Sequence, residues 1–191
     1  MLILVRHGRT ALNASGCLQG RIDEPLDEVG HAQARAVAGY VGDVDELISS
    51  PLLRACETAD AFGVPYTIDE RWIELSYGEL EGRPAADAMS AEAWEHWRND
   101  PSFAPPGGES LIALDARVRA ALADLSDRAA NRIVVVVSHV SPIKAAVAWV
   151  LGASIDIAWR SQLSQASICR IDVTRRGPVL TAFNEQAPAA I

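Results

Sequence analysis

Two histidines each follow a short apolar run. Residues 2–5 are Leu-Ile-Leu-Val and lead into Arg6 and His7, and residues 133–137 are Ile-Val-Val-Val-Val and lead towards His139. Apolar runs of this length, rich in Val and Ile, are typical of buried strands. In open α/β sheets, ligands bind at the carboxyl ends of such strands. If the two strands are neighbours, we expect the two imidazoles to meet over one edge of the sheet.

The residue types near His7 suit phosphoryl chemistry. An arginine binds phosphate oxygens through paired N–H donors, and Arg6 and Arg54 are candidates for this contact. An imidazole can attack phosphorus and form a covalent intermediate, which divides the reaction into two steps. The leaving oxygen then needs a proton, for which Glu74 is a candidate. The plainer alternatives are that Arg54 is a solvated helix arginine and that Glu74 is a surface carboxylate in a loop.

Alternating strand and helix patterns must position these side chains. A helix is predicted over residues 28–41, with Asp27 as its N-cap, and a short strand at residues 47–48. A second helix is predicted at residues 51–62, with Ser50 as its N-cap and the proline after Ser50 as its first residue. The remaining predicted elements are loops at 13–25 and 71–84, a strand at 66–68, helices at 90–98, 111–125 and 142–151, and strands at 133–137, 167–173 and 179–183.

This order of elements predicts an α/β fold with a mostly parallel central sheet, because strands alternate with helices. The run at 133–137 is apolar on both faces and is therefore expected to be a central strand. The strands at 167–173 and 179–183 are expected at an edge. A chain of 191 residues without a long linker is expected to form one domain, residues 1–191.

Charge and composition limit the kinds of partner that the protein can bind. The net charge of −8 argues against nucleic acid, which requires a broad basic surface, but it allows a small anionic substrate. No apolar run approaches a membrane span and no signal-type segment opens the sequence, so we expect a cytoplasmic location and no membrane partner. Cys17, Cys56 and Cys169 form no metal or redox motif and are expected to stay reduced. A strand edge near Leu47, or one in the late strands, could support a homodimer.

Six groups of motifs follow one another along the chain. They are Arg6-His7-Gly8-Arg9-Thr10 with Asn13; Gln19-Gly20, Asp23-x-Pro25-Leu26 and Gly30-x-x-Gln33-Ala34; Ser49-Ser50-Pro51-Leu52-x-Arg54-Ala55-x-x-Thr58-Ala59; Glu74-x-x-Tyr77-Gly78-x-x-Glu81-Gly82; Pro106-Gly107-Gly108-Glu109-Ser110; and Val137-Ser138-His139. Together they resemble the motifs of the histidine phosphatase superfamily, branch 1, which includes the cofactor-dependent phosphoglycerate mutases. The resemblance spans nearly the whole chain and implies a three-layer α/β/α sandwich, phosphoglycerate mutase-like, with a small cap at about residues 80–108.

The resemblance also implies a role for each matching residue. It makes His7 the residue that is transiently phosphorylated and Glu74 the proton donor to the leaving group. It implies no metal and no cofactor. The residues implied to surround the phosphoryl group are Arg6, Arg54 and His139, and those implied to bind substrate are Asn13, Thr10, Gln19, Gly20 and Val140.

Two positions differ from the usual family pattern. Arg9 replaces an acidic residue, so it either adds positive charge at the mouth of the pocket or is simply a solvated side chain. Val140 and Ser141 follow the second histidine, where the family often has glycine. Any backbone geometry that needs glycine at this point is therefore in doubt.

The cap favours a phosphatase over a mutase. Family mutases resemble one another in a longer, basic insertion here, whereas this cap has only Arg83 and Arg98 as basic residues beside one histidine, and carries Trp94, Trp97 and Phe103. The aromatic residues either contact an apolar or sugar-like leaving group or pack the cap onto the sheet. We therefore expect hydrolysis of a small phosphomonoester, a phosphorylated metabolite. Phosphoglycerate mutase activity is the alternative, and a non-catalytic phosphate-binding module is a third.

Overall fold

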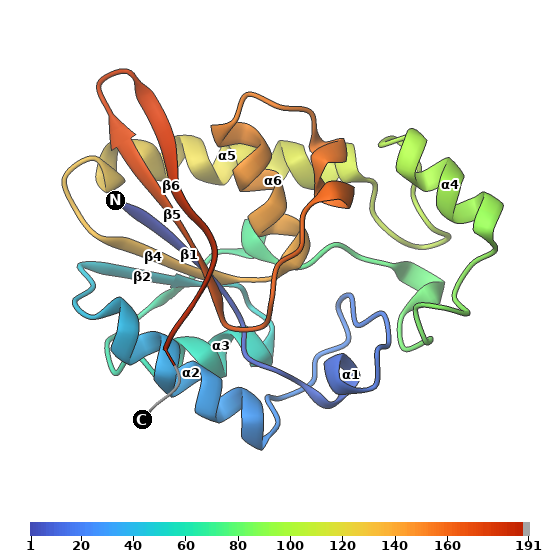
Figure 1. Ribbon diagram of the computed structural model, residues 1–191, viewed down its shortest axis with the longest axis horizontal. Coiled ribbons are helices and arrows are strands. Elements are labelled where there is room, and N and C mark those ends of the chain that lie inside the picture. Colours follow the sequence, from blue (N-terminus) through green and yellow to red (C-terminus); the bar gives the residue numbers. More distant parts are fainter. Residues whose placement is uncertain (189–191) are drawn as a thin grey trace.

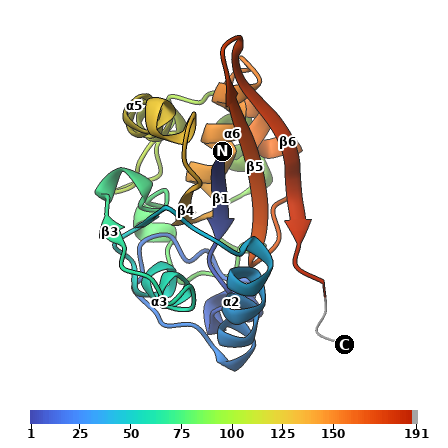
Figure 2. The ribbon, with the colours of Figure 1, turned by 90° about the vertical axis from the view of Figure 1, so that its left-hand side faces the viewer.

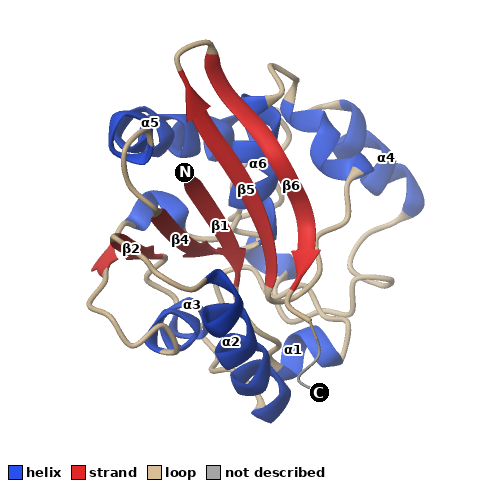
Figure 3. Cartoon of the chain, turned by 60° about the vertical axis from the view of Figure 1, so that its left-hand side comes forward, coloured by secondary structure: helices blue, strands red, loops and turns tan. Residues whose placement is uncertain are grey.

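A single twisted sheet organises the computed structural model, which describes residues 1–188. Within that range the strands lie in the order β3-β2-β4-β1-β5-β6 (Figures 1 and 3). Their bounds are β1 Leu2–Arg6, β2 Glu46–Ser49, β3 Thr67–Ile68, β4 Val134–Ser138, β5 Ser167–Thr174 and β6 Gly177–Gln186. The first four strands of the chain are mutually parallel, and β5 is antiparallel to both β1 and β6. The prediction of a mostly parallel α/β sheet is confirmed.

The two strands that lead to the histidines are neighbours. β1 pairs with β4 in parallel, and Arg6 lies opposite Ser138 in the register. The backbone N–H of His7 donates to the carbonyl oxygen of Ser138 at 3.0 Å. Both strands are buried along their whole length. Equivalent strand ends therefore deliver His7 and His139 to the same edge of the sheet, as the two apolar runs predict.

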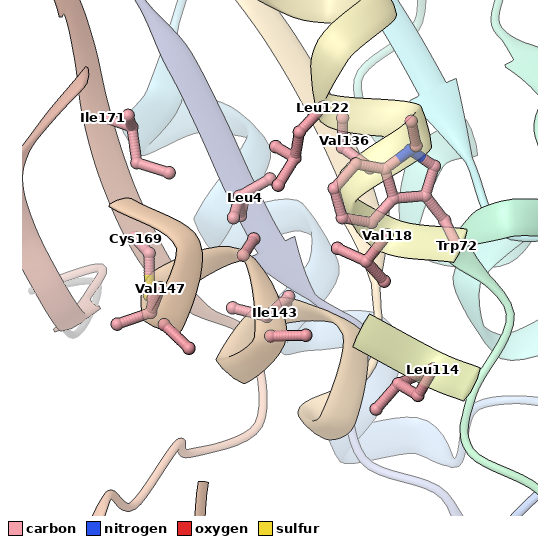
Figure 4. Packing of buried hydrophobic residues seen from close by; sticks show 14 of the residues in the cluster. Leu4, Trp72, Leu114, Val118, Leu122, Val136, Ile143, Val147, Cys169 and Ile171 are labelled. Carbon is pink, nitrogen blue, oxygen red and sulfur yellow. The ribbon is translucent and has the colours of Figure 1, made fainter. Parts of the chain in front are cut away.

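Helices cover both faces of this sheet and form three layers (Figure 2). Leu4 and other alternate strand residues pack against α5, Leu111–Ala129, and α6, Val140–Val150 (Figure 4). Val5 points to the opposite face, where the strands pack against α2, Glu28–Val41, and α3, Leu53–Asp60. A strand directs successive side chains to opposite faces, so a strand that is apolar throughout can contribute to both layers.

Side-chain caps begin several helices where the sequence predicts them. The Asp27 carboxylate accepts from the N–H of Gly30 at 2.7 Å at the start of α2. Ser90 caps α4, Ala91–Asn99, and Ser110 caps α5. Each cap satisfies one of the backbone N–H groups that a helix start leaves without an internal acceptor.

Two predicted helix starts are wrong. α3 begins at Leu53, with Leu52 rather than Ser50 at its N-cap and no side-chain cap. The Ser50 hydroxyl lies 2.6 Å from His139 Nε2 and accepts from the N–H of Leu52 at 3.4 Å. α6 begins at Val140 rather than at Pro142. A proline is tolerated in the first turn, because the N–H that it lacks would have no helical acceptor there.

Several loop and edge predictions also need correction. A short helix, α1, Ala11–Ala14, overlaps the start of the predicted loop at 13–25. It begins with a reciprocal capping box between Thr10 and Asn13. The loop at 71–84 contains the 3-10 helix Gly78–Leu80, and a second one, Glu70–Trp72, overlaps its first residues. β5 is interior, because it lies between β1 and β6. β2, the strand of Leu47, also lies between two strands, although β3 pairs only with Ile48 and Ser49.

The aromatic residues of the segment proposed as a cap pack on one another. The rings of Trp94 and Trp97 are stacked with centroids 5.5 Å apart, and Trp159 meets Trp97 edge-on at 5.5 Å. Trp97 is fully buried and Phe103 contacts it, which favours the packing interpretation for these two side chains. Trp94 is half-buried. Within residues 1–188, no helix has the length and apolar character needed to cross a membrane.

Candidate active site

His7 is buried and held in one tautomer. Its Nδ1 lies 2.6 Å from the carbonyl oxygen of Gly8, which can only accept, so Nδ1 carries the proton. Its Nε2 therefore has the lone pair and accepts from Arg54 Nε at 3.2 Å. Burial, followed by the charges of Arg54 and Arg6, lowers the pKa of His7 well below 6.5. The result is a neutral imidazole whose Nε2 lone pair is a potential nucleophile once a substrate takes the Arg54 N–H from it.

His139 lies beside it, with ring centroids 5.0 Å apart. Its Nε2 is 2.6 Å from the Ser50 hydroxyl, and its Nδ1 is buried without a partner among the described residues. Burial, followed by the charge of Arg54, lowers the pKa of His139 well below 6.5. If Ser50 donates to Nε2, Nδ1 carries a proton that is free for an acceptor.

Arg6 and Arg54 are buried cations without a carboxylate partner. Arg6 donates to the carbonyl oxygen of Leu163 at 2.6 Å, and Arg54 donates to those of Gly20 and Ile22 at 2.7 and 2.9 Å. In the described part of the chain, no carboxylate oxygen lies within 4.0 Å of either guanidinium. Burial lowers the pKa of Arg54, and that of Arg6 to about 10. Buried cations that are held by neutral acceptors attract an anion.

Glu74 supplies a carboxyl group to the same place from the loop that follows β3. It is buried, and its Oε1 accepts from the backbone N–H groups of Leu75 and Ser141 at 2.7 and 3.2 Å. These two N–H groups fix the orientation of the carboxyl group. Ser141 belongs to the first turn of α6, so this contact also joins the loop to the strand end that carries His139.

These side chains surround a cavity of about 140 Å³. Of the ten predicted site residues, eight line it: Arg6, His7, Asn13, Gln19, Gly20, Arg54, Glu74 and Val140. Thr10 and His139 are not lining residues of the cavity. Thr10 donates to Gln19 Oε1 at 3.0 Å, and Asn13 donates to the same oxygen at 3.1 Å. The amide nitrogen of Gln19 is left buried without an acceptor among the residues described, and Arg6 Nε is in the same state. The cavity therefore presents free donors and suits a group rich in acceptor oxygens.

Arg9 is not a lining residue of this cavity. Its Nε pairs with the Asp27 carboxylate at 2.7 Å, beside the start of α2. Of the two alternatives for Arg9, the structure therefore favours a side chain engaged outside the pocket. No three His, Cys, Asp or Glu side chains of residues 1–188 are grouped so that they could hold a metal ion.

Sequence reasoning assigned no role to Cys17, Leu18 and Tyr77, which also line the cavity. Burial, followed by the charge of Glu74, raises the pKa of Tyr77, so its hydroxyl stays protonated. Tyr77 follows Glu74 by three residues, and this shared segment is the signal that could have identified it. The predicted cap Ser50 instead contacts His139. The signal that could have identified it is a pair of polar residues, Ser49 and Ser50, at the end of a buried strand.

Comparison with known proteins agrees with this geometry. The chain matches the histidine phosphatase superfamily (branch 1) over residues 2–186. It is 36% identical over 176 residues to a bifunctional protein of Mycobacterium tuberculosis, and the match covers 87% of this chain and 48% of that protein. The chain thus spans about half the length of the first curated relatives that it matches.

Two further similarities bear on activity. A probable phosphoglycerate mutase of Yersinia pestis is 36% identical over 180 residues, which are 88% of this chain and 83% of that one. The structure of a phosphoserine phosphatase from Entamoeba histolytica, in complex with 3-phosphoglyceric acid, has a TM-score of 0.89 and 30% identity, and covers 97% of this chain and 96% of that chain. The extent of these matches and the shared fold establish the family: this chain belongs to branch 1 of the histidine phosphatase superfamily.

Proposed function

We propose that the protein is a phosphatase that hydrolyses a small phosphomonoester through a phosphohistidine at His7 Nε2. The observation that carries this proposal is the state of His7: a neutral imidazole, its lone pair directed at Arg54 Nε 3.2 Å away, in a cavity lined by buried cations. A site that only binds phosphate needs the cations but does not need a nucleophile in a fixed tautomer.

Substrate binding uses the free donors. The phosphoryl oxygens take the Arg54 Nε–H away from His7 and receive further hydrogen bonds from Arg6 and Gln19. Val140 opens α6, where the first backbone N–H groups have no helical acceptor, so it contributes a donor for an anion. Asn13 lines the same side of the cavity through its contact with Gln19.

In the first step, His7 Nε2 forms a bond to phosphorus while the bond between phosphorus and the ester oxygen breaks. Glu74 gives its proton to that oxygen, and the alcohol leaves. In the second step, a water molecule attacks phosphorus and the phosphorus–nitrogen bond breaks. Glu74 takes a proton from this water, which restores the starting protein and releases phosphate. Arg6, Arg54 and His139 stabilise the charge on the transferring oxygens in both steps.

A mutase would differ in what accepts the phosphoryl group from His7. The name of the Yersinia relative makes this the second candidate. The basic residues of the proposed cap count against it, because Arg83 and Arg98 are both exposed and neither lines the cavity. Because neither cap arginine is placed to hold a second phosphate, we propose water as the acceptor.

The test measures both products. The protein is incubated with 3-phosphoglycerate, with and without 2,3-bisphosphoglycerate, and separately with a panel of phosphorylated metabolites and p-nitrophenyl phosphate. We expect inorganic phosphate as the main product and loss of its release in His7→Ala. Faster isomerisation of 3-phosphoglycerate than hydrolysis of any ester would establish the mutase. Phosphate binding without turnover of any ester would establish a binding module.

A further inference from the structure

A second cavity lies beside the proposed phosphate site and shares a wall with it. Leu18, Tyr77 and Val140 line both cavities. The second cavity has a volume of about 140 Å³ and is mainly apolar, with Trp94 and Trp159 among its lining residues. An engineered apolar cavity of about 150 Å³ is known to hold benzene, so this space suits one ring-sized group. A phosphomonoester bound at His7 would place its leaving group next to this space.

One cation lines this otherwise apolar cavity. Lys144 is the one lysine in the 191-residue sequence, and it is carried by α6, the helix that begins beside His139. Its Nζ donates to the carbonyl oxygen of Ala158 at 2.8 Å. Throughout residues 1–188, no carboxylate oxygen lies within 4.0 Å of this ammonium group. An ammonium group has three donors, so this contact leaves two of them for a ligand.

The surroundings of Lys144 oppose a merely structural role. Burial lowers its pKa, so the position is costly for a cation that only donates to one carbonyl group. An apolar residue would fill the same wall at lower cost. Trp159 lines the same cavity beside Lys144, and its ring supplies apolar wall. The unpaired donors of Lys144 suit a ligand that carries acceptor oxygens into the cavity.

We propose that this cavity binds the leaving group of the substrate, and that Lys144 selects leaving groups that combine a ring-sized apolar body with a carboxylate. The inference rests on the proposed function, since it assigns the substrate class of the same site. Lys144 is here a specificity-determining residue, whereas the chemistry stays with His7 and Glu74. Binding of the carboxylate would also raise the pKa of the ammonium group, because a nearby anion favours the protonated form.

A matched pair of esters tests this. The pair is 4-(carboxymethyl)phenyl phosphate and its amide, 4-(carbamoylmethyl)phenyl phosphate, which differ in charge but little in the basicity of the leaving oxygen. A hydrogen bond to a charged group predicts that the acid has a kcat/KM about tenfold or more above that of the amide. In Lys144→Met this ratio should fall to about one, because methionine fills the apolar wall without a charge. In Arg160→Met, which removes an exposed cation next to Trp159, the ratio should stay at the wild-type value.

Binding measurements separate failure of the inference from failure of the proposed function. Calorimetry gives the Kd of both esters for His7→Ala and for His7→Ala combined with Lys144→Met. The acid should bind about tenfold more tightly than the amide in the first protein and equally in the second. Equal Kd values in His7→Ala, or a ratio that Lys144→Met leaves unchanged, would overturn the inference. A preserved Kd ratio without hydrolysis by the wild type would instead refute the phosphatase proposal and leave the cavity's selectivity supported.

Discussion

Substitution of Arg54 by methionine removes the cation closest to the proposed nucleophile. Arg54 Nε is 3.2 Å from His7 Nε2, and its other two nitrogens are held by the carbonyl oxygens of Gly20 and Ile22. The guanidinium is thus in place before substrate arrives and needs little rearrangement to stabilise charge. Loss of one such preorganised donor costs about 2.7–4 kcal/mol, or about 10²–10³ in kcat. A charge pair about 4 Å apart at an effective dielectric of about 20 is worth about 4 kcal/mol, which agrees with the upper value.

The same substitution should move the pH profile. Neutral His7 attacks and protonated His7 does not, so activity falls as pH drops through the pKa of His7. Arg54 is the second cause, after burial, of the low pKa of His7. Its removal raises this pKa towards 6.5, and the acid limb of the profile therefore shifts to higher pH.

The assay is the burst of p-nitrophenol from p-nitrophenyl phosphate, measured by rapid mixing across the acid range. This leaving group needs no proton, so the burst reports the attack of His7. Arg119→Met is the control, because Arg119 pairs on the surface with Asp115 and its side chain is 41% exposed. The control should stay within about twofold of the wild type. A burst rate of Arg54→Met within about tenfold of the wild type, or an acid limb that does not move, would refute the reasoning.

Two further substitutions test the acid and the backbone contact beside the site. Glu74→Gln should reduce the hydrolysis of alkyl phosphates by about 10²–10⁴ and that of p-nitrophenyl phosphate far less, because only the alkoxide needs the proton; equal losses for both esters would rule out proton donation. Gly30→Ala should lower the free energy of unfolding by about 1–3 kcal/mol in urea titrations, because the added Cβ would lie 2.0 Å from the carbonyl oxygen of Arg9. Gly39→Ala in the same helix meets nothing within 4 Å and should raise stability by about 0.5–1 kcal/mol; a similar change in both variants would contradict the steric argument.

Local sequence determines much of this fold. A strand that is apolar on both faces is buried between two layers, and this pattern predicts the central position of β1 and β4. Asp27 and Ser110 cap helices because their oxygens reach N–H groups only three residues away. Patterns of this kind involve neighbours along the chain, so the sequence shows them directly.

Long-range contacts decide the rest. Ser50 has the local signature of a cap, but it contacts His139, 89 residues further along the chain. The late strands both look like edge strands, and only the pairing with β1 makes β5 interior. Lys144 is the one charged residue of α6, but its environment comes from the fold, which places Ala158 and the aromatic wall beside it. Motifs indicated most of the residues that line the first cavity. Of the residues that line only the second cavity, the sequence indicated Trp94 alone, as one of the aromatic residues that could contact an apolar leaving group.

The central claim is a covalent phosphohistidine at one position, and rapid quenching tests it most directly. The protein is mixed with ³²P-labelled phosphomonoester, quenched in base on the millisecond scale, digested and mapped by mass spectrometry. We expect label on His7 Nε2 during turnover, which decays as inorganic phosphate appears and is absent in His7→Ala. Release of phosphate with no label on His7 at any time, or label on another residue, would contradict the claim.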